Sequence, residues 1–304
     1  MTSIDVRGLT KRYGSRTVVD DLSFTVPAGQ VTGFLGPNGA GKSTTMRMIM
    51  GLAASSGGSV TIGGRRYRDL PVPLTEVGAL LDAGAVHGGR TAYDHLLALA
   101  ASNGLPRRRV GEVLARTGLD GVARRRAGVF SLGMRQRLGI AATLLGDPRV
   151  LIFDEPVNGL DPEGIRWIRE FMRSLAREGR AVLVSSHLMS EMAQTADHLV
   201  VIGQGRLIAD TGMSEFMRAN GEGTVLVRTD EAPAFAVRLS AAGATVRKGS
   251  ESSLVVSGMT GAEIGKLAAY HRVALSELAP QRASLEDAFM ELTRDSVEYQ
   301  GATA

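Results

Sequence analysis

The residues best suited to chemistry in this 304-residue chain form a glycine-rich segment, GPNGAGKS, at positions 36–43. It fits the pattern GxxxxGK(S/T) in full and lies between the apolar run VTGFLG and the helix-like run STTMRMIMGL. Glycines let backbone N–H groups converge on phosphate oxygens, and the start of a helix favours negative charge. We therefore predict a phosphate-binding loop rather than a chance match in a glycine-rich hairpin. The predicted contacts come from Gly36, Pro37, Asn38, Gly39, Ala40, Gly41, Lys42, Ser43 and Thr44.

Two members of this loop have individual roles. Lys42 is expected to reach the β- and γ-phosphates of a nucleotide, and the hydroxyl of Ser43 is expected to bind Mg²⁺. Of the 35 basic residues only four are lysines. Lysine carries a compact charge on a slender stem, which suits a tight glycine cradle better than the planar fork of arginine.

A pair of carboxylates follows an apolar run more than a hundred residues later, in the segment VLIFDEP at 150–156. A carboxylate at the end of a buried strand is unfavourable unless a cation or hydrogen bonds satisfy it. Asp154 is therefore expected on the Mg²⁺ side of a nucleotide site, and Glu155 is expected to act as general base toward the attacking water. The alternative is that two acids merely end a strand.

The elements that must position these groups alternate between strand and helix over residues 1–220, which predicts an α/β core with a largely parallel sheet. Residues 150–153 are apolar at every position, as in a strand covered on both faces. Thr91 and Asp94 indicate a helix start. The expected strands lie at 3–9, 22–26, 31–36, 59–64, 150–156, 181–186 and 199–208, and the expected helices at 43–52, 91–102, 162–178 and 188–195.

The pattern changes near residues 213–223, so we divide the chain into residues 1–220 and a small C-terminal α+β domain, residues 221–304. Its expected order, βαββαβ, is the split ferredoxin-like arrangement. Two interpretations remain open for this domain, a cap that stabilises a dimer and a regulatory ligand site, and the cap is favoured. The expected strands lie at 224–229, 244–248, 253–257 and 274–278, and the expected helices at 232–242, 261–271 and 284–294.

Composition excludes several classes of protein. The net charge is only +4, and the arginine triplets at 107–109 and 124–126 are short, so we expect no nucleic-acid partner and a solvated surface at both triplets. The chain has no cysteine, which excludes disulfides and thiol chemistry. Its longest apolar run is Leu96–Ala101, whereas a membrane span needs about 20 residues. We expect no membrane span, no secretory signal and a cytoplasmic location.

Over residues 3–220 the sequence resembles the nucleotide-binding subunit of ATP-binding cassette (ABC) transporters, because several motifs occur in the family's order. Tyr13 is similar to the aromatic that stacks on adenine. FSLGM, at 130–134, resembles the signature segment that meets ATP across a dimer, and it contributes Ser131, Leu132, Gly133 and Met134. Asp161 lies in a segment similar to the loop that links the two sites of a dimer. His187 is similar to the switch histidine that contacts the γ-phosphate, and joins Lys42 and Glu155 as catalytic residues.

Two positions depart from the family pattern. The usual signature reads LSGGQ, whereas Leu132 replaces its first glycine and Met134 its glutamine; this form is similar to that of bacterial drug- and antibiotic-exporting branches. Asp82 stands where the family commonly has a glutamine near Mg²⁺, and we expect it to approach the metal. These departures leave open that the chain binds ATP without turnover, although Glu155 and His187 argue against that alternative.

The resemblance implies a P-loop NTPase cassette with a RecA-like core and a helical subdomain. It implies ATP and Mg²⁺ as cofactors, a head-to-tail homodimer and a separate transmembrane permease, on which residues 75–130, with the helix at 92–101, would dock. The expected function is ATP hydrolysis that drives an exporter of drugs, antibiotics or other small molecules, from a peripheral position on the inner face of the membrane. The alternative is a cassette ATPase outside transport, such as one that assembles iron–sulfur clusters.

Overall fold

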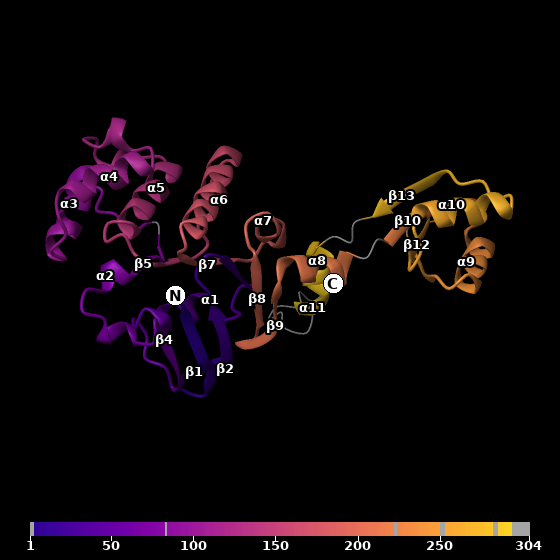
Figure 1. The fold of residues 1–304 in the computed structure, drawn as a ribbon, viewed down its shortest axis with the longest axis horizontal. Coiled ribbons are helices and arrows are strands. Elements are labelled where there is room, and N and C mark those ends of the chain that lie inside the picture. Colours follow the sequence, from indigo (N-terminus) through magenta and orange to yellow (C-terminus); the bar gives the residue numbers. More distant parts are fainter. Residues whose placement is uncertain (1–2, 83, 222–223, 250–252, 282–284, 294–304) are drawn as a thin grey trace. The chain divides into compact units, whose positions relative to one another are not determined.

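The computed structural model describes residues 3–82, 84–221, 224–249, 253–281 and 285–293. The chain divides into two compact units, a larger one that contains Met1–Gly212 and a smaller one, Met213–Leu292 (Figure 1). This division lies a few residues before the predicted boundary at residue 220, at the start of α8 (Met213–Gly221). The predicted boundary therefore stays a proposal, and each unit is described by itself.

A six-stranded sheet forms the centre of the larger unit. Its spatial order is β5 (Val77–Leu80), β6 (Val150–Phe153), β7 (Ala181–Ser186), β3 (Val31–Leu35), β8 (His198–Gly203) and β9 (Arg206–Gly212). Every neighbouring pair is parallel except β8 and β9. The residues of β6 are at most 1% exposed, so the predicted strand covered on both faces is confirmed. Parallel strands bring the carboxyl ends of β3, β6 and β7 to one edge of the sheet.

A second, antiparallel sheet joins the first through apolar packing. Its order is β2 (Arg16–Val26), β1 (Ile4–Tyr13) and β4 (Gly57–Ile62). Phe24 of β2 stacks on Phe34 of β3 with ring centroids 5.2 Å apart. The buried cluster around them includes Met46 and Ile49 of α1 (Lys42–Ile49). The helix that follows the phosphate loop is thus anchored by its apolar face between the two sheets.

The remaining helices of the larger unit include a helical subdomain, in which α3, α4 and α5 contact one another (Figure 1). Their bounds are α2 (Pro73–Glu76), α3 (Ala92–Ser102), α4 (Arg108–Arg116), α5 (Leu132–Thr143), α6 (Pro162–Arg177) and α7 (Met189–Ala193). The predicted start of α3 is confirmed, because the Asp94 N–H donates to Thr91 Oγ1 at 3.0 Å. None of the helices among the described residues is long and apolar enough to cross a membrane.

Several elements differ from the sequence prediction. The run at 199–208 is a hairpin of β8 and β9, because Gln204 and Gly205 both adopt positive φ and reverse the chain. The strand β5 was not expected, since Gly78 interrupts its apolar pattern; an added Cβ there would lie 2.1 Å from the Thr143 carbonyl oxygen. Helices α4 and α5 were not among the expected helices either.

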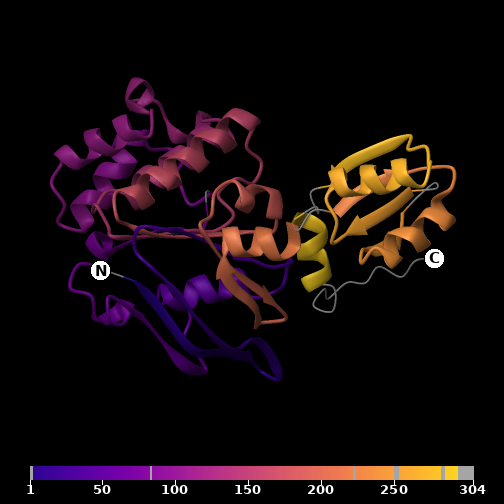
Figure 2. The same ribbon diagram turned by 45° about the vertical axis from the view of Figure 1, so that its right-hand side comes forward.

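The smaller unit has the predicted βαββαβ order. Its strands are β10 (Thr224–Arg228), β11 (Thr245–Lys248), β12 (Ser253–Ser257) and β13 (Glu277–Gln281), and its helices include α9 (Ala232–Ala241), α10 (Gly261–Tyr270) and α11 (Leu285–Thr293). The sheet is antiparallel in the order β11–β12–β10–β13, and α9 and α10 share a buried core with it (Figure 2). The last strand begins three residues later than predicted, because its pairing with β10 starts at Glu277, opposite Arg228. The Ala274 carbonyl oxygen instead accepts from Thr229 Oγ1, just beyond the end of β10.

Candidate nucleotide-binding and hydrolysis site

The phosphate loop lies between β3 and α1, as the sequence predicts. Two of its glycines leave no room for a side chain. A Cβ at Gly36 would lie 2.5 Å from the Ile202 carbonyl oxygen, and one at Gly41 would lie 2.8 Å from the Val18 carbonyl oxygen. Gly41 also has φ of +102° immediately before the helix, a conformation that disfavours other residues. The loop is therefore held tightly against neighbouring backbone, with the N-terminus of α1 directed at the cavity that it borders.

Lys42 holds the loop together from inside. Its side chain is buried, and Nζ donates to the carbonyl oxygens of Gly36 at 2.7 Å and Pro37 at 3.3 Å. Burial lowers the pKa of Lys42, and the nearby carboxylates of Glu155 and Asp154 oppose that shift. A desolvated ammonium group at a helix N-terminus favours an anionic ligand, because negative charge relieves the penalty of burying the cation.

Glu155 connects Lys42 to His187. Its Oε1 lies 3.5 Å from Lys42 Nζ, and its Oε2 lies 2.9 Å from His187 Nδ1. An ionised carboxylate only accepts hydrogen bonds, so with Glu155 charged Nδ1 carries the proton. Glu155 also adopts φ of +48°, a left-handed conformation that costs about 1–2 kcal/mol for a side chain of this kind. The structure thus joins three residues that the sequence predicts to be catalytic.

Ser185, which sequence reasoning missed, holds the two carboxylate residues in place. Its fully buried hydroxyl donates to Asp154 Oδ1 at 2.6 Å and accepts from the Glu155 N–H at 2.8 Å. One hydroxyl therefore orients Asp154 and fixes the strained backbone of Glu155. The available signal was a pair of serines ending the apolar strand AVLVSS, beside the strand that ends in Asp154.

A cavity of about 380 Å³ opens above the loop. Tyr13 lies at its rim with 55% of its surface exposed, and Lys11 Nζ lies 4.6 Å from the centroid of the tyrosine ring. The ammonium group of Lys11 therefore covers one face of the Tyr13 ring. An exposed aromatic ring is suited to stacking on the flat base of a nucleotide. The lining residues are Tyr13, Arg16, Val18, Pro37, Asn38, Gly39, Ala40, Gly41, Lys42, Ser43, Thr44 and Glu155.

Comparison with known proteins agrees with this geometry. A family model described as ABC transporter matches residues 19–158. YhcH of Bacillus subtilis, described as an uncharacterized ABC transporter ATP-binding protein, is 44% identical over 210 residues, which cover 68% of this chain and 69% of that protein. This chain belongs to the ATP-binding proteins of ABC transporters. The members of this family are ATPases that power transport, so this ABC protein binds ATP and hydrolyses it.

Two further likenesses each cover 71% of this ABC protein. The bacitracin transport ATP-binding protein BcrA of Enterococcus faecalis is 39% identical over 71% of each chain. A solved structure titled as the ATP binding subunit of an ABC transporter has a TM-score of 0.64 and 29% identity, covering 71% of this chain and 92% of that chain. The match to a domain of unknown function (DUF8746) at residues 223–286 concerns the smaller unit.

The signature residues of this ABC protein lie outside the cavity. Ser131 is exposed and caps α5, with its Oγ accepting from the Met134 N–H at 3.2 Å. The side chain of Leu132 packs over Gly159, where an added Cβ would lie 2.7 Å from Leu132 Cδ2. Gly133, in the first turn of α5, faces Leu160. None of the four signature residues lines the nucleotide cavity of its own chain.

The loop between Glu155 and α6 is tied to both neighbouring elements. Asp161 caps α6, and its Oδ1 accepts from the Gly164 N–H at 2.9 Å. Gln136 of α5 is buried and donates to the Pro156 carbonyl oxygen at 2.8 Å. The signature helix is thereby bonded to the residue that follows Glu155, a link that the sequence alone did not indicate.

Asp82 lies just beyond β5, which ends at the same edge of the sheet as β6. Its exposed carboxylate accepts from the Gly84 N–H at 2.7 Å and closes a local turn. The predicted approach of Asp82 to Mg²⁺ stays a prediction. Among the described residues, no group of three or more His, Cys, Asp and Glu forms a metal cage.

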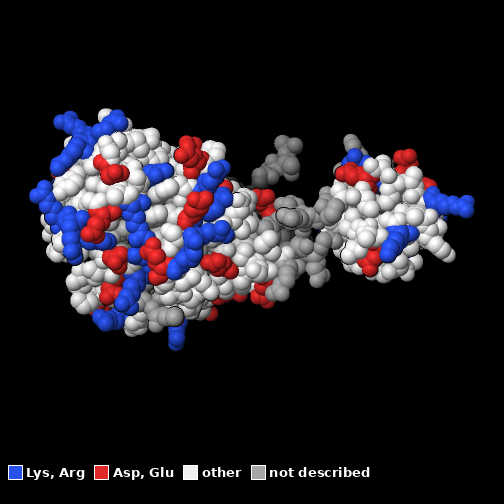
Figure 3. Space-filling view, turned by 45° about the horizontal axis from the view of Figure 1, so that its top comes forward, with Lys and Arg blue, Asp and Glu red and all other residues white. Residues whose placement is uncertain are grey.

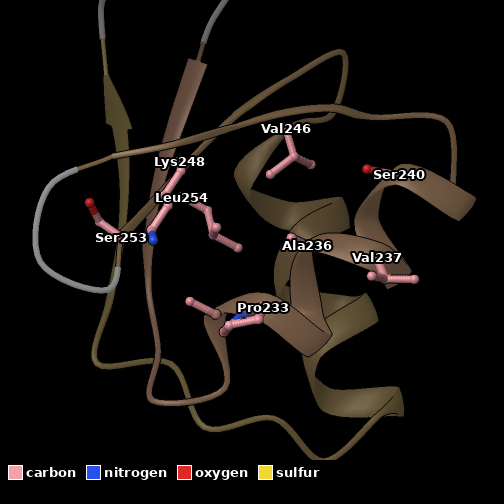
Figure 4. A pocket seen from close by; sticks show the side chains of 9 residues that line it. Pro233, Ala236, Val237, Ser240, Val246, Lys248, Ser253 and Leu254 are labelled. Atoms are coloured by element: carbon pink, nitrogen blue, oxygen red, sulfur yellow. The ribbon is translucent and has the colours of Figure 1, made fainter.

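The smaller unit contains a larger cavity, of about 510 Å³, between α9 and the strands β11 and β12 (Figure 4). Its walls are apolar, and Lys248 is the one charged side chain among its described lining residues. The lining residues are Ala232, Pro233, Ala236, Val237, Ser240, Val246, Lys248, Ser253 and Leu254. The described lining residues include no carboxylate, histidine or phosphate loop, and so they do not provide the groups for ATP hydrolysis.

Proposed function

We propose that this chain is the ATPase subunit of a membrane exporter that moves a drug, an antibiotic or another small molecule. The observation that supports hydrolysis is the chain of contacts from Lys42 through Glu155 to His187, with Asp154 held beside it by Ser185. The observation that supports export is the likeness to a bacitracin transport ATP-binding protein over 71% of both chains.

In the proposed hydrolysis, Lys42 turns from Glu155 toward the β- and γ-phosphates when ATP binds. Glu155 then accepts a proton from a water molecule whose oxygen attacks the γ-phosphorus, while the bond from the γ-phosphorus to the β–γ bridging oxygen breaks. His187 is held by Glu155 and contacts the γ-phosphate. Phosphate oxygens would thereby replace the carboxylate of Glu155 as partners of Lys42.

Ser43 and Asp154 are the proposed ligands of Mg²⁺. Ser43 stands in the first turn of α1, and Ser185 engages one oxygen of Asp154 while the other has no hydrogen-bond partner among the described residues. Mg²⁺ commonly takes one or two protein ligands together with waters and phosphates, so this small donor set fits it. The ion would neutralise charge that develops on the phosphates.

A head-to-tail homodimer completes the proposed site. The exposed position of Ser131, outside the cavity of its own chain, supports a role opposite the ATP of a second copy. Contacts made through the γ-phosphate would favour the closed pair, and hydrolysis would remove them. Asp161 would lie in the loop that links the two sites.

The proposed partner is a separate transmembrane permease, which holds the ATPase at the inner face of the membrane. Affinity purification from detergent-solubilised membranes tests this assignment, and we expect an integral membrane protein to be recovered in stoichiometric amount. Recovery with soluble partners alone, such as an iron–sulfur scaffold, would overturn the exporter assignment and leave the ATPase assignment intact.

A further inference from the structure

The net positive charge of this protein is concentrated in one segment. Residues 90–126 contain eight arginines and three acidic residues, a net charge of +5, whereas the whole chain carries +4. The rest of the chain is therefore slightly acidic. The small net charge of the whole chain therefore conceals a strongly basic region between the phosphate loop and the signature segment.

The fold gathers this basic segment around the start of α3. The Ala92 N–H donates to the Arg125 carbonyl oxygen at 3.2 Å, and the Tyr93 N–H donates to that of Ala123 at 2.9 Å. The Ala127 N–H in turn donates to the Arg90 carbonyl oxygen at 2.9 Å. These bonds lay the second arginine triplet alongside Arg90, although more than thirty residues separate them in sequence.

Tyr93 brings the first arginine triplet to the same place. The guanidinium carbon of Arg124 lies 4.4 Å from the centroid of its ring, and that of Arg107 lies 5.7 Å away. Arg107 Nε also donates to the Tyr93 hydroxyl at 2.7 Å. One tyrosine thus contacts an arginine from each triplet, so that both triplets belong to a single surface.

Six of the eight arginines of this segment are exposed and have no acidic partner among the described residues. Arg109 and Arg116 form ion pairs with Glu112 and Glu178. In the described part of the chain, no carboxylate lies within ion-pair distance of the other six. We call these six the arginine surface: Arg90, Arg107, Arg108, Arg124, Arg125 and Arg126. Figure 3 shows basic side chains gathered over the end of the larger unit where α3 and α4 lie.

We propose that the arginine surface binds the phosphate headgroups of anionic phospholipids in the bilayer that holds the permease. This inference rests on the proposed function, in which a permease holds this chain at the membrane, and on the expected docking of residues 75–130 on that permease. Clusters of four to eight basic residues next to a membrane bind anionic lipids with about 1 kcal/mol, or roughly fivefold in affinity, per residue.

Two observations favour a bilayer over a nucleic acid or an acidic peptide. Val129 stands beside the arginine surface with 66% of its surface exposed, and its N–H donates to the Arg126 carbonyl oxygen. An exposed apolar side chain among cations suits the boundary between headgroups and acyl chains. Binding to single-stranded nucleic acid relies on free aromatic faces, whereas the Tyr93 ring is covered by two guanidinium groups.

Co-sedimentation of the purified full-length protein with vesicles tests the proposal. We compare vesicles of phosphatidylcholine alone with vesicles of equal parts phosphatidylcholine and phosphatidylglycerol. Binding is expected to the anionic vesicles and to weaken as salt is added. The triple variant Arg124→Gln/Arg125→Gln/Arg126→Gln is expected to bind them on the order of 100-fold more weakly.

A matched control removes the same charge elsewhere. Arg166, Arg173 and Arg177 are exposed on α6, and the variant Arg166→Gln/Arg173→Gln/Arg177→Gln should retain vesicle binding. Both variants should hydrolyse ATP at the unaltered rate. Equal losses in the two variants, or binding to RNA or polyglutamate but not to anionic vesicles, would overturn the proposal. If the unmodified protein did not hydrolyse ATP, the proposed function would be wrong, whatever the result with vesicles.

Discussion

Two cavities of this protein differ in the residues that line them, and the smaller of the two contains the residues proposed for catalysis. The cavity at the phosphate loop measures about 380 Å³ and contains a buried lysine, a strained glutamate and the N-terminus of α1. The cavity in the smaller unit measures about 510 Å³ and has apolar walls with a single charged side chain, Lys248, among its described lining residues. The proposed catalytic site is therefore distinguished by its buried, mutually oriented charges and not by its volume.

The difference follows from the elements around each cavity. Parallel strands end together at the phosphate loop, so that the two acids after β6 and Ser185 of β7 meet beside the loop after β3. In the smaller unit, α9 lies against β11 and β12 and contributes alanine, proline and valine side chains. Four variants test this contrast.

The largest effect is expected for Glu155→Gln. Removing the proposed base should lower the rate of ATP turnover by about 10³-fold, because the amide cannot accept a proton from water. ATP binding should persist, since Lys42 and the loop are unaltered. Phosphate release and calorimetric titration with ATP measure the two effects. Glu163→Gln, at an exposed acid of α6, is the control; turnover unchanged in Glu155→Gln would remove Glu155 from its role.

The next effect concerns binding rather than turnover. Lys42→Ala should weaken ATP binding about 100-fold, which corresponds to about 3 kcal/mol, because a buried charge pairs with the phosphates. Titration calorimetry with ATP measures the loss, and Lys266→Ala, at an exposed lysine of α10, should have no effect. Equal ATP affinity in Lys42→Ala and the unmodified protein would show that the loop binds phosphate without this cation.

A smaller effect is expected for Ser185→Ala, which removes the hydroxyl between Asp154 and Glu155. Turnover should fall roughly 10-fold while ATP affinity changes little, because the hydroxyl acts by orienting both residues. Ser185→Thr keeps the hydroxyl and should restore most of the rate.

Ser186→Ala provides the matched control, because Ser186 is equally buried but its hydroxyl bonds to the backbone of Leu188 instead. Both alanine variants lose a buried hydrogen bond, which costs about 1–3 kcal/mol of stability. If their turnover fell equally, the role of Ser185 would be purely structural.

Substitutions in the larger cavity are expected to leave ATP affinity and turnover unchanged. Lys248→Ala combined with Val237→Ser alters its charge and its apolar wall, and ATP affinity and turnover should match those of the unmodified protein. Thermal unfolding followed by circular dichroism checks that the variant folds. A change in turnover would show that the larger cavity influences ATP hydrolysis, and it would favour the interpretation of the smaller unit as a regulatory ligand site.

The glycine-rich segment and the two acids after an apolar strand predicted much of the site. Those motifs are local: a loop between β3 and α1 needs its glycines wherever the rest of the chain lies. The contribution of Ser185 could not be predicted, because a serine ending a strand acquires its role from the neighbouring strand. Asp82 and the signature residues stay predictions, since their expected partners are a metal and a second copy of the chain.

The sequence by itself determined the phosphate loop, the alternation of strand and helix and the βαββαβ order of the smaller unit, because each depends on residue type and short-range periodicity. The tertiary structure alone decided which charges act together. It placed His187 and Lys42 on the two oxygens of Glu155, and it brought two arginine triplets to one tyrosine. The sequence predicted only that both triplets lie on the solvated surface. Electrostatic interactions depend on distance in space, and spacing along the chain does not determine that distance.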